Sequence, residues 1–138
     1  MIEIVPTEDR TACYALRHTV FVLEQGYTAE GEVDDLDPVS HHLLAQEDGR
    51  PIATARVYLS GETAKIGRVC VLAEKRGSGL GADLIVAAVA LAREKGALRA
   101  VLGAQAHVVG FYDKLGFTAY GEAYDDEGEP HQMMECVL

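Results

Sequence analysis

The stretch between residues 65 and 104 constrains the fold more than any other part of the chain. It holds an apolar run over 65–72, the glycine-rich hexapeptide RGSGLG, a segment over 79–95 whose apolar residues recur at helical spacing, and a second apolar run over 98–104. Two apolar strands joined by one helix predict a right-handed β-α-β crossover with parallel strands. Ser78 is the expected N-cap of the helix and Gly96 its expected end.

The segments on either side predict further strands and two shorter helices. Thr7 is the expected N-cap of a helix that ends near Gly26, and an acidic loop follows over 26–40. Residues 42–72 contain three apolar stretches with Asp48-Gly49 as a hairpin turn, which predicts three antiparallel strands. A short helix over 107–116 and strands near 117–120 and 131–138 complete an α+β fold. We expect residues 1–138 to form one domain.

The charge and cysteine content exclude several classes of protein. A net charge of −10 disfavours nucleic acid and anionic membranes as partners, because both bind chiefly through Lys and Arg. Cys13, Cys70 and Cys136 form no C-x-x-C pair, so neither a disulfide framework nor a zinc site is expected. The five histidines lack metal-ligand spacing, and we expect no metal. The absence of a signal-peptide pattern and of a long apolar run predicts a cytoplasmic location.

Acidic residues gather in two clusters. The first lies in residues 24–37 and contains no Lys or Arg; the second lies in residues 122–129. Two interpretations stay open, namely a solvated acidic surface and an acidic mouth that attracts a cationic substrate. The members of the two clusters are Glu24, Glu30, Glu32, Asp34, Asp35 and Asp37, and Glu122, Asp125, Asp126, Glu127 and Glu129.

The glycine-rich hexapeptide predicts a phosphate site. A mononucleotide P-loop is excluded, because Ala82 and Asp83 stand where Lys and Ser or Thr are required. A dinucleotide site is excluded as well, since four residues separate the strand from the glycines and no acid follows at the ribose position. What remains is a loop of backbone N–H groups that opens a helix, with Lys75 and Arg76 beside it. Such a loop favours a diphosphate.

Two motifs together resemble those of a known family. The hexapeptide RGSGLG after an apolar strand resembles the R-x-x-G-x-G/A acetyl-CoA motif of the GCN5-related N-acetyltransferases (GNAT), and FYDKLGF, residues 111–117, is similar to the helix after their fifth core strand. The stretches LRHTVFVLEQ, EGEVDDLD, IGRVCV, LGAQAHVVGFYDKLGF and YDDEGEPHQMM resemble the ElaA-like branch over nearly the whole chain. The resemblance implies the GNAT fold, with six to seven strands in a mixed, mostly antiparallel sheet, and an acetyl-CoA-dependent N-acetyltransferase.

The resemblance also implies roles for particular residues. The strand before the loop would pair with the pantetheine arm, and the N–H of Val71 would face the thioester oxygen. Tyr112 would protonate the departing thiolate, while Gln105 stands where many members carry an asparagine near the pantetheine. The cofactor-binding set is therefore Val69, Cys70, Val71, Arg76, Gly77, Ser78, Gly79, Leu80, Gly81, Gln105 and Tyr112.

The acceptor side is less defined. The implied reaction is direct attack by a primary amine in a ternary complex, and the acceptor is a small-molecule amine, a peptide N-terminus or a lysine. Arg68 stands where some relatives carry a glutamate, so the identity of the general base stays open. Whether the protein forms a homodimer stays open as well. The candidates for the base are Glu24, Glu32, Asp34, Asp37, His42 and His131, of which all but His42 are also candidates for substrate binding.

Two alternative functions remain. One is a catalytically silent acyl-CoA-binding module. The other is an acyltransferase similar to the acyl-homoserine lactone synthases, which Arg17-x-x-Val20-Phe21 and Arg56 resemble loosely. Those proteins are considerably longer, use S-adenosylmethionine and usually lack so complete a glycine loop. An assay with S-adenosylmethionine and an acyl carrier separates this class from an N-acetyltransferase.

Overall fold

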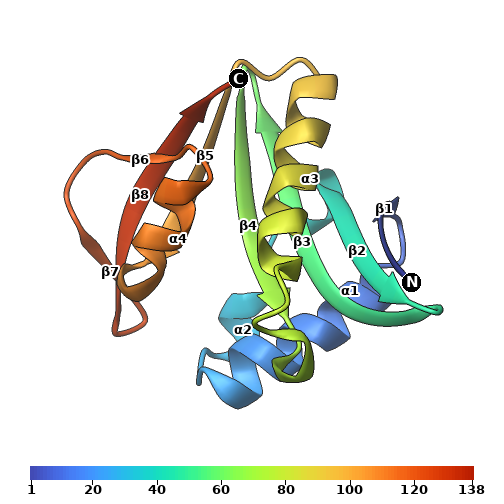
Figure 1. Ribbon diagram of the computed structural model, residues 1–138. Coiled ribbons are helices and arrows are strands. Elements are labelled where there is room, and N and C mark those ends of the chain that lie inside the picture. The colour runs from blue at the N-terminus through green and yellow to red at the C-terminus, as the bar shows by residue number, and fades with distance from the viewer.

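A single mixed sheet with helices on both faces organises the computed structural model, which describes residues 1–138 (Figure 1). In chain order the elements are β1 (Ile2–Thr7), α1 (Arg10–Arg17), the π-helix η1 (His18–Glu24), α2 (Ala29–Glu32), the 3₁₀ turn η2 (Asp37–Val39), β2 (His41–Glu47), β3 (Arg50–Ser60), β4 (Thr63–Val71), the 3₁₀ turn η3 (Ala73–Lys75), α3 (Leu80–Glu94), β5 (Arg99–Gln105), the 3₁₀ turn η4 (Ala106–Val108), α4 (Val109–Lys114), β6 (Thr118–Ala119), β7 (Tyr124–Asp126) and β8 (Glu129–Val137).

The strand order confirms the expected α+β class. The sheet runs β1-β2-β3-β4-β5-β8-β6, and β7 pairs with β8 on the side. Only β4 and β5 are parallel, and all other neighbours are antiparallel. The sheet has eight strands because β7 forms a short hairpin with β8 that the sequence pattern does not predict. Asp48 and Gly49 form the predicted β2–β3 turn, both with positive φ.

The predicted β-α-β crossover is confirmed as β4, α3 and β5. Helix α3 begins after Gly79, whose φ of 87° is a left-handed conformation, and no side chain caps it. Ser78 is therefore not the N-cap, and its hydroxyl instead donates to the carbonyl oxygen of Lys75 at 2.7 Å. Gly96, with φ of 91°, ends the helix as predicted. The loop that receives α3 is thus shaped by glycine backbone rather than by a side-chain cap.

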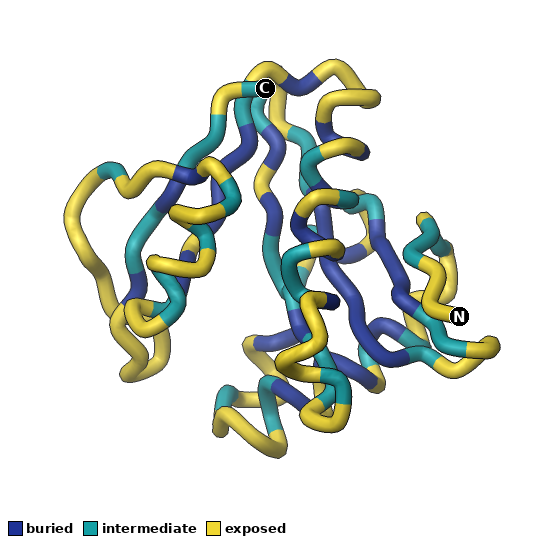
Figure 2. Tube along the Cα trace, in the orientation of Figure 1, coloured by how far each residue is buried: buried dark blue, intermediate teal, exposed yellow.

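Both faces of the sheet are buried, because neighbouring residues of a strand point to opposite faces. Leu43 packs into the large cluster on the α3 side, while the next residue, Leu44, packs with Cys13 and Leu16 of α1 on the opposite face. In Figure 2 the middle parts of β2 and β3 are accordingly dark blue, whereas the loop before β7 and the β7–β8 turn are exposed. The core therefore stiffens β3 and β4 from both sides and leaves the hairpin near the C-terminus open to solvent.

The first helix changes type along its length. Asp9, not Thr7, caps α1, because its carboxylate accepts from the N–H of Ala12 at 3.1 Å and Thr7 belongs to β1. The chain then continues as the π-helix η1, and Gly26, with φ of 81°, follows its end, as predicted. Single turns of π-helix are often found at functional sites, and η1 lies beside the cavity described next.

Candidate active site

The two parallel strands separate along their length. Strands β4 and β5 pair only from Thr63 to Lys65 with Arg99 to Val101. Beyond that point they diverge, as the two halves of the molecule do in Figure 1. From Ile66 onward the edge of β4 that faces β5 therefore has no strand partner. Backbone groups along this edge lack a strand partner and can pair with an extended ligand in place of the missing strand.

A bulge in β4 accompanies the separation. Thr54 lies opposite Cys70 and Arg56 opposite Gly67, so β4 uses one residue more than β3 between these pairs. Arg68, within the bulge, has φ of 50°, a left-handed conformation that an arginine adopts at a cost of about 1–2 kcal/mol. A bulge increases local twist and bends the strand, which turns the end of β4 away from β5.

A cavity of about 750 Å³ fills the opening between the strands, and a smaller one of about 360 Å³ lies at the glycine loop. Val71 and Arg76 line both, so the two spaces adjoin. The residues predicted for the cofactor or the substrate that line the larger cavity are Val69, Cys70, Val71, Arg76, Gln105, Tyr112, Glu32, Asp34 and His131. Gly77, Gly79 and Gly81 line the smaller one, whereas Glu24, Asp37, Ser78 and Leu80 line neither.

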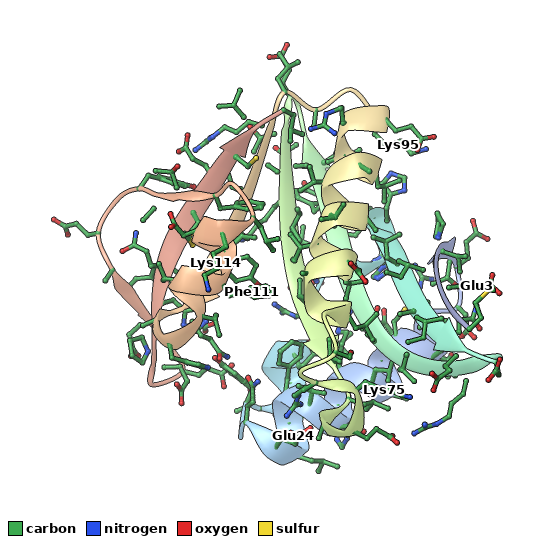
Figure 3. The ribbon with its side chains drawn as sticks, in the orientation of Figure 1. Glu3, Glu24, Lys75, Lys95, Phe111 and Lys114 are labelled. Atoms are coloured by element: carbon green, nitrogen blue, oxygen red, sulfur yellow. The ribbon has the colours of Figure 1, made fainter.

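The glycine loop has the conformation and the space expected of a phosphate site. Gly77 and Gly79 have φ of 81° and 87°, and a Cβ atom at either would meet no atom within 4 Å. At Gly81 a Cβ would lie 3.6 Å from Phe111, at ordinary contact distance. The side chain of Phe111 thus reaches from α4 to the start of α3 (Figure 3). Leu80 is buried in the core, so only its backbone is available to the loop.

The two cations beside the loop are already partnered. Lys75 forms an ion pair with Glu47. Arg76 pairs with Glu24 at 2.9 Å, and its Nε donates to the carbonyl oxygen of Val71 at 3.0 Å. Figure 3 shows Lys75 and Glu24 near the loop. The expected excess of positive charge is therefore reduced by acids that lie far away in the sequence, and the backbone N–H groups are the main donors that the loop offers.

Tyr112 lies in the wall of the larger cavity. Its ring packs edge-on against Phe111 at 5.1 Å and Phe117 at 6.0 Å between ring centroids. Burial raises the pKa of the Tyr112 phenol to about 12, because the charged form would lose its hydration. The phenol therefore stays protonated at neutral pH, as a proton donor must. Cys70 is buried as well, and burial raises the pKa of its thiol to about 12, which makes it a poor nucleophile.

Half of the first acidic cluster is neutralised by three arginines from other elements. Arg17, buried in α1, donates from Nε to Glu32 at 2.9 Å and from Nη1 to Asp37 at 2.7 Å. Burial alone would raise the pKa of the Asp37 carboxyl, but the Arg17 hydrogen bond holds that pKa well below its usual range. Asp37 is fully buried and cannot reach a ligand. We call Arg17, Arg56, Arg68, Glu32, Asp34 and Asp37 the arginine–carboxylate cluster.

The other two arginines connect this cluster to the cavity wall. Arg56 of β3 pairs with Asp34 at 2.7 Å and with Asp37 at 3.1 Å. Arg68, the residue with positive φ in the bulge, pairs with Glu32 at 2.8 Å and with Asp34 at 3.1 Å. Three positive and three negative charges balance, so Glu32, Asp34 and Asp37 give the cavity wall no net negative charge. The pattern around residues 24–37 gave no sign of these arginines, because they lie on α1, β3 and β4.

The second acidic cluster keeps its charge. None of its five carboxylates forms an ion pair with a Lys or Arg. Glu127, in the β7–β8 turn, accepts from the N–H of Thr28 at 3.2 Å and so links the turn to the segment before α2. At the end of β5, Gln105 donates to the side chain of Gln25 at 2.8 Å and lies 3.5 Å from the Tyr27 hydroxyl. These contacts join the two halves of the molecule at the cavity.

The two candidate histidines occupy different places. His131 of β8 lines the cavity, is buried, and stacks on Tyr124 with ring centroids 5.5 Å apart. His42 of β2 lies outside the cavity, and its Nε2 is 2.9 Å from the carbonyl oxygen of Asp37. No group of three or more His, Cys, Asp or Glu side chains is placed to hold a metal ion, and all three cysteines are free. None of the helices combines the length and hydropathy that crossing a membrane requires.

Comparisons with known proteins agree with this architecture. The model of the acetyltransferase (GNAT) domain matches residues 10–138. Escherichia coli ElaA is 34% identical over 125 residues, which cover 87% of this chain and 82% of ElaA. Its crystal structure aligns with a TM-score of 0.88 over 99% of both chains. An acyl-CoA N-acyltransferase from Pseudomonas aeruginosa, 32% identical, aligns with a TM-score of 0.90 over 99% of this chain and 100% of its own.

A more distant structure shares the fold. The GNAT family acetyltransferase from Elizabethkingia anophelis, solved with acetyl-CoA bound, is 20% identical and aligns with a TM-score of 0.77 over 99% of this chain and 98% of its own. A mixed sheet that opens between two parallel strands, with a glycine loop at the opening, thus defines an acyltransferase fold. The chain belongs to the GNAT acetyltransferase family, in its ElaA-like branch.

Proposed function

We propose that residues 1–138 form one acetyltransferase domain, which moves an acetyl group from acetyl-CoA to a primary amine by direct attack in a ternary complex. The observation that carries the proposal is the unpaired edge of β4, which leads from the bulge at Arg68 to the glycine loop. An extended pantetheine arm fits such an edge, and a pyrophosphate fits the adjoining smaller cavity. The acetyl-CoA bound to the Elizabethkingia anophelis relative supports the same donor here.

The acyl group would lie near the end of β4. Backbone groups of Val69 to Val71 would hold the pantetheine arm, and Gln105 would contact it from β5. The N–H of Val71 would stabilise the oxyanion that forms when the amine attacks the thioester carbonyl. An unpaired donor in a cavity that excludes bulk water is worth more than the same donor in solution, because it needs no reorganisation.

Tyr112 would complete the reaction. When the tetrahedral intermediate collapses, the C–S bond breaks and the phenol gives its proton to the thiolate. The high pKa of Tyr112 keeps the proton in place until a strong base, the departing thiolate, forms beside it. In this proposal Arg17, Asp37 and Glu32 have a structural role, since their charged groups are satisfied within the arginine–carboxylate cluster.

The test measures thiol release from acetyl-CoA with a panel of primary amines, for the wild type and Tyr112→Phe. We expect turnover with at least one amine and a loss of kcat of about 100-fold or more in the variant, the range of a general acid. Binding of acetyl-CoA by calorimetry should be retained, because Phe keeps the ring packing. Binding without turnover on any amine would indicate the silent module instead.

A second test separates cofactor binding from folding. Gly79 and Gly96 lie at opposite ends of α3, and both have positive φ. A Cβ atom added at either residue would lie within 4 Å of no other atom. Alanine at either position therefore carries a similar conformational cost, of about 1–2 kcal/mol. Only Gly79→Ala should weaken acetyl-CoA binding, because only Gly79 lies at the proposed pyrophosphate site. Equal affinities of the two variants would contradict the proposal.

A further inference from the structure

We propose that the Nε2 atom of His131 is the general base that takes a proton from the acceptor amine. The inference rests on the proposed acetyl transfer and adds to it the residue that activates the acceptor. His131 lies on β8, opposite Gln105 of β5 and opposite Tyr124 of β7 in the strand register. It therefore lines the same cavity as Val71 and Tyr112, from the other side of the opening.

Hydrogen bonding selects the form of the imidazole ring. Nδ1 of His131 lies 2.9 Å from the backbone carbonyl oxygen of Glu129. A carbonyl oxygen can only accept, so Nδ1 carries the hydrogen. In the neutral ring the lone pair is then on Nε2, which is the arrangement that a histidine base requires. Stacking on Tyr124 holds the ring in this orientation.

The lone pair of Nε2 faces open space. His131 is only 7% exposed, yet its Nε2 has no hydrogen-bond partner in the protein. The one enclosed side-chain polar atom without a partner is Nδ1 of His42. Nε2 of His131 is therefore accessible from the cavity that the residue lines, rather than sealed in the core. A buried ring with one nitrogen satisfied and the other free toward a cavity is suited to proton transfer.

The other candidates for the base are engaged elsewhere. Glu32 and Asp37 bind Arg17, Asp34 binds Arg56, and Glu24 binds Arg76. His42 does not line the cavity. Each of the four carboxylates is held by an arginine. His131 can accept a proton at Nε2 without breaking any contact.

Other titratable side chains share this part of the cavity. Tyr124, Asp126 and Glu127 come from the β7–β8 hairpin, Tyr27 comes from the segment before α2, and His107 comes from η4, which packs against β8. The carboxylates of Asp126 and Glu127 form no ion pair with a Lys or Arg. They would favour a positively charged acceptor and would stabilise the imidazolium after proton transfer.

The step is balanced as follows. The acceptor enters as an ammonium ion, and Nε2 takes one proton to give a neutral amine and an imidazolium. The nitrogen lone pair then forms the C–N bond while the π pair of the carbonyl moves to its oxygen. Collapse breaks the C–S bond, Tyr112 protonates the thiolate, and the second amine proton restores the phenol. The imidazolium releases its proton to solvent, so the products are an amide, free thiol and one proton.

The kinetic test compares two acceptors with His131→Gln. Benzylamine is mostly protonated at pH 7.5, whereas aniline is neutral. We expect kcat/KM to fall by about 100-fold or more with benzylamine and by less than about tenfold with aniline, because only the first needs its proton removed before attack. The deficit with benzylamine should shrink as the pH rises to 9.5. Exposed His18 supplies the control, and His18→Gln should match the wild type.

Two independent measurements, one kinetic and one by NMR, can overturn the proposal. An equal loss with both amines at every pH would show a structural role for His131, and unchanged activity would show none. Long-range ¹H–¹⁵N NMR of the ¹⁵N-histidine protein at pH 8 should show hydrogen on Nδ1, and hydrogen on Nε2 would contradict the geometry even if no amine is turned over. Failure of the wild type to bind acetyl-CoA would instead refute the proposed function.

Discussion

Replacing Asp37 with Asn tests the arginine–carboxylate cluster directly. The Arg17 and Asp37 side chains are 1% and 0% exposed, and two hydrogen bonds of 2.7 and 3.1 Å join them. Asp37→Asn keeps the size of the side chain but removes one of the cluster's three negative charges, so that three arginines share two carboxylates. Breaking a buried pair in this way costs about 3–5 kcal/mol. With a urea m-value of about 2 kcal/mol/M, the unfolding midpoint should fall by about 2 M.

A matched pair at the surface provides the control. Arg50 and Glu74 also form an ion pair, but their side chains are 55% and 54% exposed. Glu74→Gln makes the same acid-to-amide change, and water replaces the lost interaction. We expect its midpoint to equal that of the wild type. A similar shift in both variants would mean that burial does not set the energy of these pairs.

The pH dependence has a definite sign. Arg17 holds the pKa of Asp37 well below the value of about 3.9 that an unfolded aspartate has. The folded state therefore binds this proton less readily than the unfolded state, and the stabilisation is fully present above about pH 4. It is lost as the pH falls through the folded-state pKa. The gap between wild type and Asp37→Asn should be constant from pH 5 to 8 and narrow below pH 4. A gap below about 1 kcal/mol at pH 7, or one that widens in acid, would refute the argument.

Three further predictions concern the cavity. In an alkaline titration, the tyrosinate absorbance of the wild type should exceed that of Tyr112→Phe only near pH 12 rather than near 10, because burial disfavours the phenolate. An absorbance difference near pH 10 would mean that the ring is exposed to water. Gly103→Ala should displace Tyr124, because a Cβ atom at residue 103 would overlap the Tyr124 hydroxyl, and NMR should detect the lost ring-current shift on His131 while stability changes little. Iodoacetamide at pH 8 should leave Cys70 unmodified until the protein unfolds, because burial raises the pKa of the thiol to about 12; peptide mapping would show any earlier reaction.

Local patterns in the sequence predicted much of the fold. The β-α-β unit, the hairpin turn at Asp48-Gly49 and the end of α3 at Gly96 follow from periodicity and turn chemistry, which depend on neighbouring residues. The N-caps predicted at Thr7 and Ser78 were wrong, because tertiary structure selected the backbone conformation at the start of each helix. In each case the correct boundary lies within two residues, where sequence patterns decide least.

The charge of the site could not be predicted in the same way. Residues 24–37 contain six acids and no base, so a local count describes a negative surface. Folding brings in Arg17 from α1, Arg56 from β3 and Arg68 from β4, and these arginines balance the charges of Glu32, Asp34 and Asp37. Pairing between elements depends on strand order and register, which no window of residues contains.

The opening of the sheet depends on interactions that compensate for lost strand pairing. A regular β4 would continue its ladder with β5, and the cavity would close. The bulge prevents this, but it places Arg68 at positive φ. The energetic cost of that conformation would by itself favour a regular strand over the bulge. Ion pairs from Arg68 to Glu32 and Asp34 offset that cost, and Gln105 holds the end of β5 to Gln25. The same ion pairs thus engage two acids of the cluster and stabilise the bulged conformation of β4.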